Sequence, residues 1–222
     1  MTLSALISKT TPPLKTSDTV EHALGIMLEM RVRHLPVIDE DGILVSVVSE
    51  EQLLDALKSD ATLDSLRTGG TPASGFLDDH VFDLTKTMVR HDLTTLPIID
   101  RNRRYAGLIE RHDIFDQFAR MLSTQESGAI LALEISPRDY SLAKLIHTVE
   151  QNDAKVLSVA SEPPDEITGK LTVTLKLNTM DATRIRHVLA HHGYNVVASF
   201  GESEDEEELL LRVQEFMRYL EV

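Results

Sequence analysis

His187 and His191 stand four residues apart on a predicted helix, a spacing at which two imidazoles can bind one metal ion from the same helix face. No Glu-containing zinc-protease signature accompanies them. The two histidines instead flank an apolar stripe made by Ile185, Val188 and Leu189. We therefore assign both histidines to a solvated helix face, and the sequence predicts no metal site.

Gly70 and Gly75 have the spacing that opens a phosphate-binding loop, which continues with Lys and then Ser or Thr. This chain has Phe76 and Leu77 at those positions, so nucleotide hydrolysis is not expected there. The chain also lacks a Gly-x-Gly-x-x-Gly sequence, a recognisable Ser-His-Asp arrangement and any cysteine. The sequence therefore predicts a protein that is not an enzyme, with no catalytic residue and no cofactor.

Composition and charge narrow the choice of partners and compartment. The 222 residues carry a formal net charge of -14, which argues against a nucleic-acid partner because phosphate backbones are bound through Lys and Arg. The opening MTLSALISKTTPP has no basic leader, and no stretch approaches the roughly 18 consecutive apolar residues of a membrane span. We expect a cytoplasmic protein with no membrane partner.

An internal repeat organises the first half of the chain. The phrase RHLPVID at residues 33–39 returns as TTLPIID at residues 94–100, an offset of 61 residues. Each copy reads as a helix, two short strands joined by a turn, and a second helix. The helical stripes expected to face the core are Val20, Ala23, Leu24, Met27 and Leu28, then Leu53, Leu54 and Leu57, and in the second copy Val81, Leu84, Met88 and Val89, then Ile114, Phe115, Phe118 and Leu122.

A different pattern follows the second copy. Residues 129–201 alternate strand, helix, strand, strand, helix and strand, the βαββαβ order of a ferredoxin-like fold. Beyond it, Ser203 and Glu206 fit a capping box that opens an amphipathic helix over residues 203–222. The predicted class is α/β and α+β: a pseudo-symmetric pair of repeats, a βαββαβ domain and a C-terminal helix. Their expected ranges are 1–63, 64–124, 129–201 and 203–222.

The two copies resemble CBS domains in tandem, the arrangement called a Bateman module. The resemblance rests on the hydrophobic-Pro-hydrophobic-hydrophobic-Asp phrase and on a strand that ends in Gly-h-h-Thr/Ser-x-x-Asp, here SVVSEEQ at residues 46–52 and GLIERHD at residues 107–113. Residues 129 to about 200 resemble an ACT domain in element order. The combination is similar to small CBS-ACT proteins of the acetoin-utilisation accessory type.

This resemblance implies an adenosyl ligand, such as AMP, ADP, ATP or S-adenosylmethionine, in the cleft between the repeats. A carboxylate can accept hydrogen bonds from both ribose hydroxyls, while a Ser or Thr hydroxyl orients the sugar or phosphate. The first copy keeps Ser49 but has Gln52 for the carboxylate, and the second keeps Asp113 but has Glu110 for the hydroxyl. Asp113 acting only as a helix cap is the alternative. The implied nucleotide-binding residues are Asp113, Thr10, Thr11, Thr71, Ser49, Gln52, His34 and Thr95.

The ACT-like region departs from the pattern of members that bind amino acids. Those members present a Pro-Gly turn between the first strand and helix, whereas this chain has Asp139 and Tyr140 there, followed by Ser141. A side chain in place of Gly obstructs close approach of a ligand to the backbone. Asp139, Tyr140 and Ser141 remain the candidates for amino-acid binding, and a structural or dimer-forming role is the preferred hypothesis.

Together these features favour a non-catalytic regulatory or sensor protein that forms a homodimer, a frequent arrangement for both resembled families. Ligand binding to the CBS pair is expected to influence the ACT-like domain or a regulated partner protein. The sequence specifies neither the ligand nor the identity of the partner. The alternative is a dimerising interaction scaffold whose ligand sites have degenerated.

Overall fold

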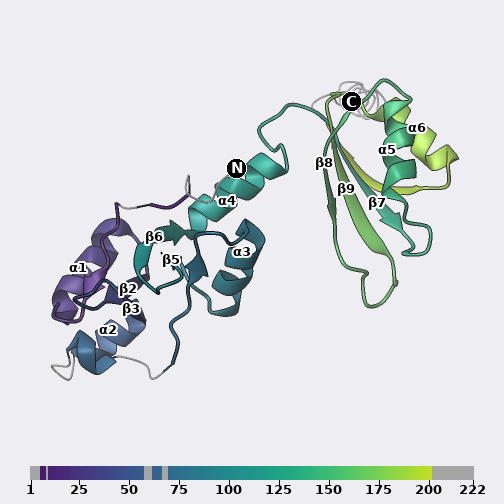
Figure 1. Cartoon of the computed structure of the whole chain (residues 1–222). Helices are drawn as coiled ribbons and strands as arrows, with labels where there is room; N and C mark the ends of the chain where they lie inside the picture. Colours follow the sequence, from purple (N-terminus) through teal and green to yellow (C-terminus); the bar gives the residue numbers. More distant parts are fainter. Residues whose placement is uncertain (1–5, 9, 58–61, 67–69, 202–222) are drawn as a thin grey trace, which may run out of the picture. The chain divides into compact units, whose positions relative to one another are not determined.

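The computed structural model describes residues 6–8, 10–57, 62–66 and 70–201. The chain divides into two compact units, Met1–Gln117 and Phe118–Val222, which are treated separately below (Figure 1). The amphipathic helix expected at residues 203–222, with its capping box, lies outside the described residues. No helix in the described ranges is long and apolar enough to cross a membrane.

Unit 1 contains the two repeats, and each has the predicted helix, two strands and helix, preceded by a short strand that the sequence did not predict. The first consists of β1 (Leu14–Lys15), α1 (Val20–Met30), β2 (His34–Ile38), β3 (Leu44–Ser49) and α2 (Glu50–Leu57). A short 3₁₀ turn, η2 (Leu63–Leu66), precedes the second, which consists of β4 (Gly75–Phe76), α3 (Val81–Arg90), β5 (Thr95–Ile99), β6 (Tyr105–Glu110) and α4 (Arg111–Met121).

The two sheets of unit 1 have the same topology and register. In the order β1-β2-β3 and β4-β5-β6, the first pair of strands is parallel and the second antiparallel. Leu14 pairs with Val37 in one sheet, and Gly75 pairs with Ile98, 61 positions later, in the other. The sequence repeat is therefore a structural repeat at the level of individual strand pairs.

The aspartate that ends each repeated phrase closes the hairpin that follows it. Asp39 Oδ1 accepts hydrogen bonds from the N–H of Asp41 at 3.1 Å and of Ile43 at 2.9 Å. Asp100 Oδ1 accepts from Asn102 at 2.8 Å and Arg104 at 2.9 Å. The N–H groups in the turn have no partner in the antiparallel pairing of the two strands. A carboxylate oxygen that accepts hydrogen bonds from two of them satisfies these donors. The aspartate therefore lies at the same distance from the turn in both repeats because its side chain forms hydrogen bonds to the turn backbone.

Part of the predicted core is wrong. Leu28 in α1 is 83% exposed and Val89 in α3 is 75% exposed. The other exposed members of the predicted stripes are Leu54 at 48%, Leu57 at 41%, Phe115 at 72% and Leu122 at 38%. The sheets cover only the stripe that contains residues such as Ala23, Met27, Leu84 and Met88, and the apolar stripe in the sequence is wider than the area they cover.

Unit 2 has the predicted βαββαβ order. It consists of β7 (Ile130–Ile135), α5 (Leu142–Glu150), β8 (Val156–Ser161), β9 (Leu171–Leu177), α6 (Thr183–His191) and β10 (Asn195–Phe200). The strands lie in the order β10-β7-β9-β8 with every neighbouring pair antiparallel. The core lies between the sheet and the two helices, and it includes Leu133, Val173, Leu145 and Leu189. His187 and His191 are exposed on α6, as the sequence predicts.

We expect Asp39→Ala and Asp100→Ala each to lower the free energy of unfolding by about 1 to 2 kcal/mol, because each removes two hydrogen bonds to a charged acceptor. The measurement is urea unfolding followed by circular dichroism. Glu40→Ala removes a neighbouring exposed carboxylate and serves as the matched control, with an expected change below about 0.5 kcal/mol. Equal losses in the control and the aspartate variants would contradict this role.

Candidate functional site

The two repeats of unit 1 meet at equivalent positions. The Arg33 N–H donates to Thr94 Oγ1 at 3.1 Å, and Thr95 Oγ1 donates to the carbonyl of His34 at 2.6 Å. Positions 33 and 94, and 34 and 95, are counterparts in the two repeats. Counterparts can touch each other only where a local two-fold axis passes between them, so this axis runs between β2 and β5.

The hairpin tips provide a second contact of the same kind. Ile43 and its counterpart Arg104 form an antiparallel bridge, with Leu44 N–H donating to Arg103 O at 3.1 Å and Tyr105 N–H donating to Gly42 O at 2.9 Å. These two hydrogen bonds are related by the offset of 61 residues. Contacts at the strand starts and at the hairpin tips therefore hold the repeats in one pseudo-symmetric arrangement.

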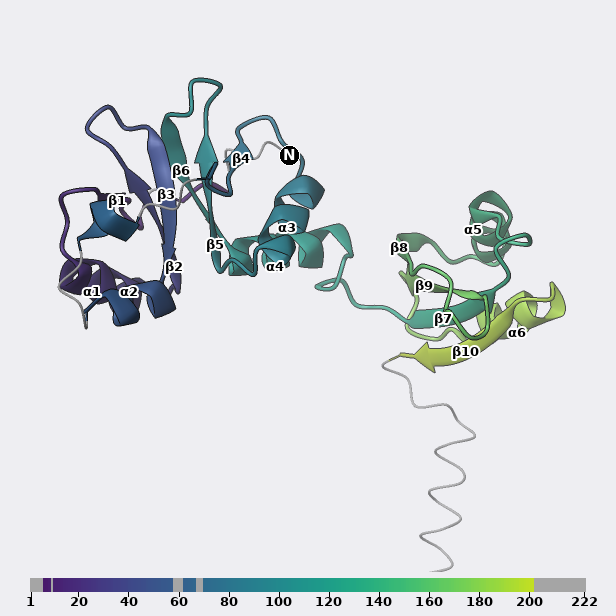
Figure 2. The ribbon, with the colours of Figure 1, turned by 90° about the horizontal axis from the view of Figure 1, so that it is seen from below.

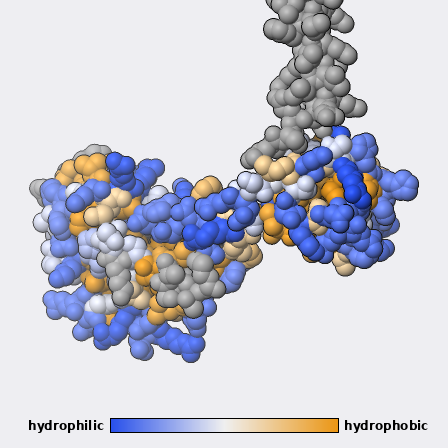
Figure 3. Space-filling model, turned by 90° about the horizontal axis from the view of Figure 1, so that it is seen from above, coloured by the Kyte–Doolittle hydropathy of each residue, from blue (hydrophilic) through white to orange (hydrophobic). Residues whose placement is uncertain are grey.

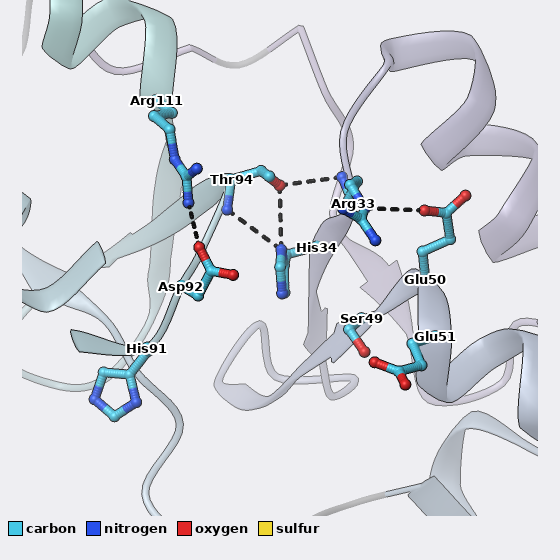
Figure 4. Close-up of a pocket in the computed structure, with 9 residues that line it drawn as sticks. All are labelled: Arg33, His34, Ser49, Glu50, Glu51, His91, Asp92, Thr94 and Arg111. Atoms are coloured by element: carbon cyan, nitrogen blue, oxygen red, sulfur yellow. Dashed lines mark hydrogen bonds and ion pairs between the residues drawn. The ribbon is translucent and has the colours of Figure 1, made fainter. Parts of the chain in front are cut away.

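A pocket of about 220 Å³, which we call the axis pocket, opens beside the strand-start contact (Figure 4). It receives residues from both repeats: the ends of α1 and α3, the starts of β2 and β5, and the N-termini of α2 and α4. Its lining residues are Arg33, His34, Ser49, Glu50, Glu51, His91, Asp92, Thr94 and Arg111.

Two arginines, one from each repeat, give the axis pocket its cationic groups. Arg33 Nε lies 3.2 Å from Glu50 Oε2, and Arg111 Nη2 lies 3.0 Å from Asp92 Oδ1. Arg111 also donates from Nε and Nη2 to the carbonyl of Leu93 at 3.1 and 2.7 Å. A guanidinium has five N–H donors, so these bonds leave each arginine able to donate to an anionic ligand.

His34 stands at the centre of the pocket and links the repeats through its ring (Figure 4). Its Nδ1 accepts from the N–H of Thr94 at 3.3 Å and lies 3.2 Å from Thr94 Oγ1. An accepting Nδ1 assigns the ring proton to Nε2 in the neutral form. Burial lowers the pKa of His34, Asp92 opposes this by favouring the charged ring, and Arg33 and Arg111 add to the lowering.

The predicted nucleotide-binding residues fall into three places. His34 and Ser49 line the axis pocket, and Thr95 is buried beneath it through its bond to the His34 carbonyl. Arg33, Thr94 and Arg111 line it too, but sequence reasoning missed them. The available signal was the repeated phrase itself, whose first residue is Arg33 in one copy and Thr94 in the other.

Gln52 and Asp113 lie at equivalent helix starts and bond the backbone there. Gln52 Oε1 accepts from Ser49 N–H at 2.9 Å while Ser49 Oγ accepts from Gln52 N–H at 3.2 Å, which makes a reciprocal cap for α2. Asp113 Oδ2 accepts from Glu110 N–H at 3.0 Å at the start of α4. Asp113 is thus the third residue of α4 and bonds the backbone just before the helix, rather than being the N-cap expected as the alternative. Its role toward a ligand stays a prediction.

The segment before β1 reaches the end of β6. Thr11 is buried and its hydroxyl donates to Glu110 Oε1 at 3.4 Å, while Glu110 Oε2 lies 3.3 Å from His112 Nδ1. Thr11 thus joins the cluster around Asp113 that the sequence proposed. Thr10 and Thr71 are exposed and do not line the axis pocket.

Unit 2 has a pocket of its own, of about 450 Å³, which we call the β7–α5 pocket. All three predicted amino-acid-binding residues line it, since Asp139, Tyr140 and Ser141 form the connection between β7 and α5. Ser141 caps α5, and Tyr140 packs against the apolar core. The remaining lining residues are Glu134, Ile135, Ser136, Arg138, Lys144, His192, Gly193 and Tyr194.

Comparison with known proteins identifies unit 1. Residues 3–59 and 76–120 match the family model of the CBS domain, and these two ranges coincide with the two repeats. Unit 1 is therefore a CBS domain pair, and the predicted mixed α/β fold class is confirmed. CBS domain pairs are in general regulatory parts of proteins rather than catalytic ones.

One solved structure shares the fold over about half of the chain, and others are similar. A CBS domain pair/ACT domain protein from Thermotoga maritima is 23% identical with a TM-score of 0.50, and the match covers 55% of this chain and 99% of that one. A CBS domain pair in complex with 5′-methylthioadenosine and S-adenosyl-L-methionine is 24% identical with a TM-score of 0.46, covering 54% and 97%. The ACT-like identity of unit 2 stays a prediction.

Curated relatives match different shares of the chain. An uncharacterized 33.4 kDa protein from Thermofilum pendens is 23% identical over 186 residues, which are 73% of this chain and 61% of that protein. A homoserine O-acetyltransferase from Methanococcoides burtonii is 28% identical over 102 residues, which are 46% of this chain and 21% of that protein. The chain therefore spans about a fifth of the length of this relative. So short a match to a much longer enzyme does not transfer its activity.

The lowered pKa of His34 predicts a pH dependence of stability. The folded protein binds the His34 proton less tightly than the unfolded chain, whose ordinary pKa is 6.5, so this contribution is present above pH 6.5 and is lost as the pH falls below it. Protonation of Nδ1 also removes the acceptor for Thr94 N–H.

Unfolding free energies measured between about pH 8 and about pH 5 test this expectation. The wild-type protein should lose more stability over that range than His34→Gln, which has no titrating ring but keeps an amide oxygen as an acceptor. Identical pH slopes in the two proteins would rule out His34 as the cause.

Proposed function

We propose that this chain is a non-catalytic regulatory protein whose CBS pair binds an adenosyl compound between its two repeats. The observation that carries the proposal is the axis pocket, in which Arg33 of the first repeat and Arg111 of the second line one cavity on the local two-fold axis. A ligand bound to both arginines contacts both repeats and so reports on their relative orientation.

The chemistry of the axis pocket suits the anionic end of a nucleotide. Two guanidiniums, the Ser49 hydroxyl and the Thr94 hydroxyl provide donors for phosphate oxygens. The volume of about 220 Å³ is smaller than the roughly 300 to 1,000 Å³ of pockets for whole drug-sized ligands. The pocket therefore accommodates the phosphate part, with the adenosine extending beyond it.

Carboxylates in the same pocket compete with a phosphate for the two arginines. Glu50 and Asp92 already pair with the two arginines, and Glu51 adds a third negative charge. A phosphate must displace or share these carboxylates, whose exposed ion pairs contribute little to stability. Each of these ion pairs joins two segments of the same repeat. A ligand that replaces them binds both repeats at once. Binding therefore changes the equilibrium between different relative orientations of the two repeats. A ligand shifts that balance only by its differential affinity for the two arrangements.

Thermal-shift titration of ligand-stripped protein with AMP, ADP, ATP and S-adenosylmethionine tests the proposal. A ligand that binds the native state raises the melting temperature as its concentration rises. We expect Arg33→Gln and Arg111→Gln each to weaken nucleotide binding by roughly tenfold, the loss of about one charge-assisted hydrogen bond.

The matched control is Arg101→Gln, which removes an arginine from an exposed ion pair, with Asp78, outside the axis pocket. It should leave the titration unchanged. Asp113→Ala tests separately whether that carboxylate also contacts the ligand. A response to no nucleotide at millimolar concentration would favour the alternative, an interaction scaffold with degenerate ligand sites.

Amino-acid binding by unit 2 is a second candidate function, favoured by the β7–α5 pocket. Arg138, Lys144 and the N-terminus of α5 lie at one pocket and offer groups that bind a carboxylate, while Glu134 and Asp139 offer acceptors for an ammonium group. The structural role preferred from the sequence rests on Asp139 and Tyr140, which stand where the resembled family has a Pro-Gly turn, and the Tyr140 side chain packs against the apolar core. Relation to acetoin utilisation remains an expectation from the resemblance.

Isothermal titration with the twenty amino acids distinguishes these two roles. If the pocket binds an amino acid, Arg138→Gln should weaken it by roughly tenfold. Arg184→Gln, on α6 and paired with Asp153 rather than in the pocket, should bind as the wild type does. The absence of heat with every amino acid at millimolar concentration would leave unit 2 with the structural role.

A further inference from the structure

His34 contacts both the other repeat and the axis pocket. Its Nδ1 lies 3.3 Å from the backbone nitrogen of Thr94 and 3.2 Å from Thr94 Oγ1. The opposite side of the ring carries Nε2 and points away from Thr94 into the pocket (Figure 4). In Figure 2, β2 and β5, which begin at His34 and Thr95, run side by side through unit 1. One imidazole therefore joins the contact between the repeats to the space for a ligand.

The Thr94 hydroxyl can bond His34 in either protonation state of the ring. A hydroxyl both donates and accepts, so Oγ1 can donate to Nδ1 of the neutral ring or accept from Nδ1–H of the charged ring. In both states Oγ1 keeps a lone pair for the Arg33 N–H, which donates to it at 3.1 Å. Protonation therefore changes the hydrogen bonds between the repeats without leaving the ring nitrogen unpaired.

The charged and titratable groups around His34 come from both repeats. They are Asp92, His91, Glu50, Glu51, Arg111 and Arg33. Burial has the largest effect on the pKa of His34 and lowers it, Asp92 raises it, and the two arginines lower it further.

An oxyanion in the axis pocket adds negative charge beside this ring. Hydrophilic residues cover much of unit 1 in Figure 3, and charges on such a surface are screened by solvent. His34 is partly buried, so a charge in the pocket acts on it with less screening. A negative charge close to an imidazole favours its protonated form. Occupation of the pocket by an oxyanion should therefore reverse the lowering of the His34 pKa.

We propose that an oxyanion in the axis pocket binds together with one proton on His34, so that the CBS pair binds phosphorylated ligands more tightly as the pH falls. This inference rests on the proposed nucleotide function of the same pocket. The neutral ring donates from Nε2, and the charged ring donates a stronger, charge-assisted hydrogen bond. Because the same ring also bonds Thr94, the charge of the ligand affects the contact between the repeats.

NMR titration of the His34 ring in the full chain tests the proton directly. The titration is made without added anion, with AMP, and with sodium sulfate against sodium chloride at equal ionic strength. Sulfate keeps its charge throughout the range from about pH 5 to about pH 8 that the imidazole requires. We expect both AMP and sulfate to raise the pKa of His34, whose resonance is assigned by its loss in His34→Gln.

Calorimetric titration with AMP measures the effect on affinity. The ring is neutral at about pH 8 with and without ligand, and as the pH falls it is protonated first in the complex, so lower pH favours binding. Between about pH 8 and about pH 6 the affinity of the wild type should rise roughly threefold to tenfold more than that of His34→Gln. The AMP phosphate also titrates in this range, and the comparison between the two proteins removes its contribution.

The matched control is His22→Gln, which removes an exposed histidine of α1 that does not line the pocket. It should keep the pH dependence of the wild type. Repeating each titration in two buffers of different ionisation enthalpy counts the protons bound with AMP, and the wild type should take up more than His34→Gln.

The possible outcomes separate this inference from the nucleotide function. An unchanged pKa of His34 in protein saturated with AMP would overturn the inference and leave nucleotide binding in place. Equal pH dependence of AMP affinity in the wild type and His34→Gln would do the same. A pKa raised by sulfate in a protein that binds no AMP would support the inference and reject the nucleotide function. Binding of neither anion would reject both.

Discussion

The contact between counterpart residues on the local two-fold axis is the constraint on which unit 1 depends. The axis fixes which segments approach each other, because only positions at the strand starts and the hairpin tips can meet their own counterparts. Repeat symmetry does not require the two sides to be chemically equal. Thr94 Oγ1 accepts from the Arg33 backbone, and the reverse bond is impossible because the arginine side chain has no acceptor. The axis pocket is therefore symmetric in position but different in chemistry on its two sides.

That difference extends to the groups that would meet a ligand. Glu50 opens α2 and its counterpart Arg111 opens α4, so the two helix starts bring opposite charges to the same pocket. The two repeats therefore contribute chemically different groups to the axis pocket. The helix caps limit this divergence, since Gln52 and Asp113 are both tied to the backbone at their helix starts.

The axis pocket lies close along the chain to exposed apolar residues of the flanking helices. Leu28 and Val89 lie near the ends of the helices that lead into Arg33 and Thr94, and Leu54 and Phe115 lie about one turn beyond Glu50 and Arg111. A change in the relative orientation of the repeats moves both the pocket and these residues, because each set is built from segments of both repeats.

Sequence alone determined the repeat, the order of elements in unit 2, the helix, two strands and helix of each copy in unit 1, and the placement of Asp139, Tyr140 and Ser141 at one connection. These features depend on local periodicity and on turn chemistry, which short stretches of sequence contain. It did not determine that Arg33, Thr94 and Arg111 share a pocket with His34, or that Leu28 and Val89 lie outside the core. Those facts depend on how segments distant in the chain pack, because a stripe of apolar residues marks a helix face without saying how much of it a sheet will cover. The tertiary structure decided both, by bringing counterparts together on the axis and leaving the outer edge of each helix uncovered.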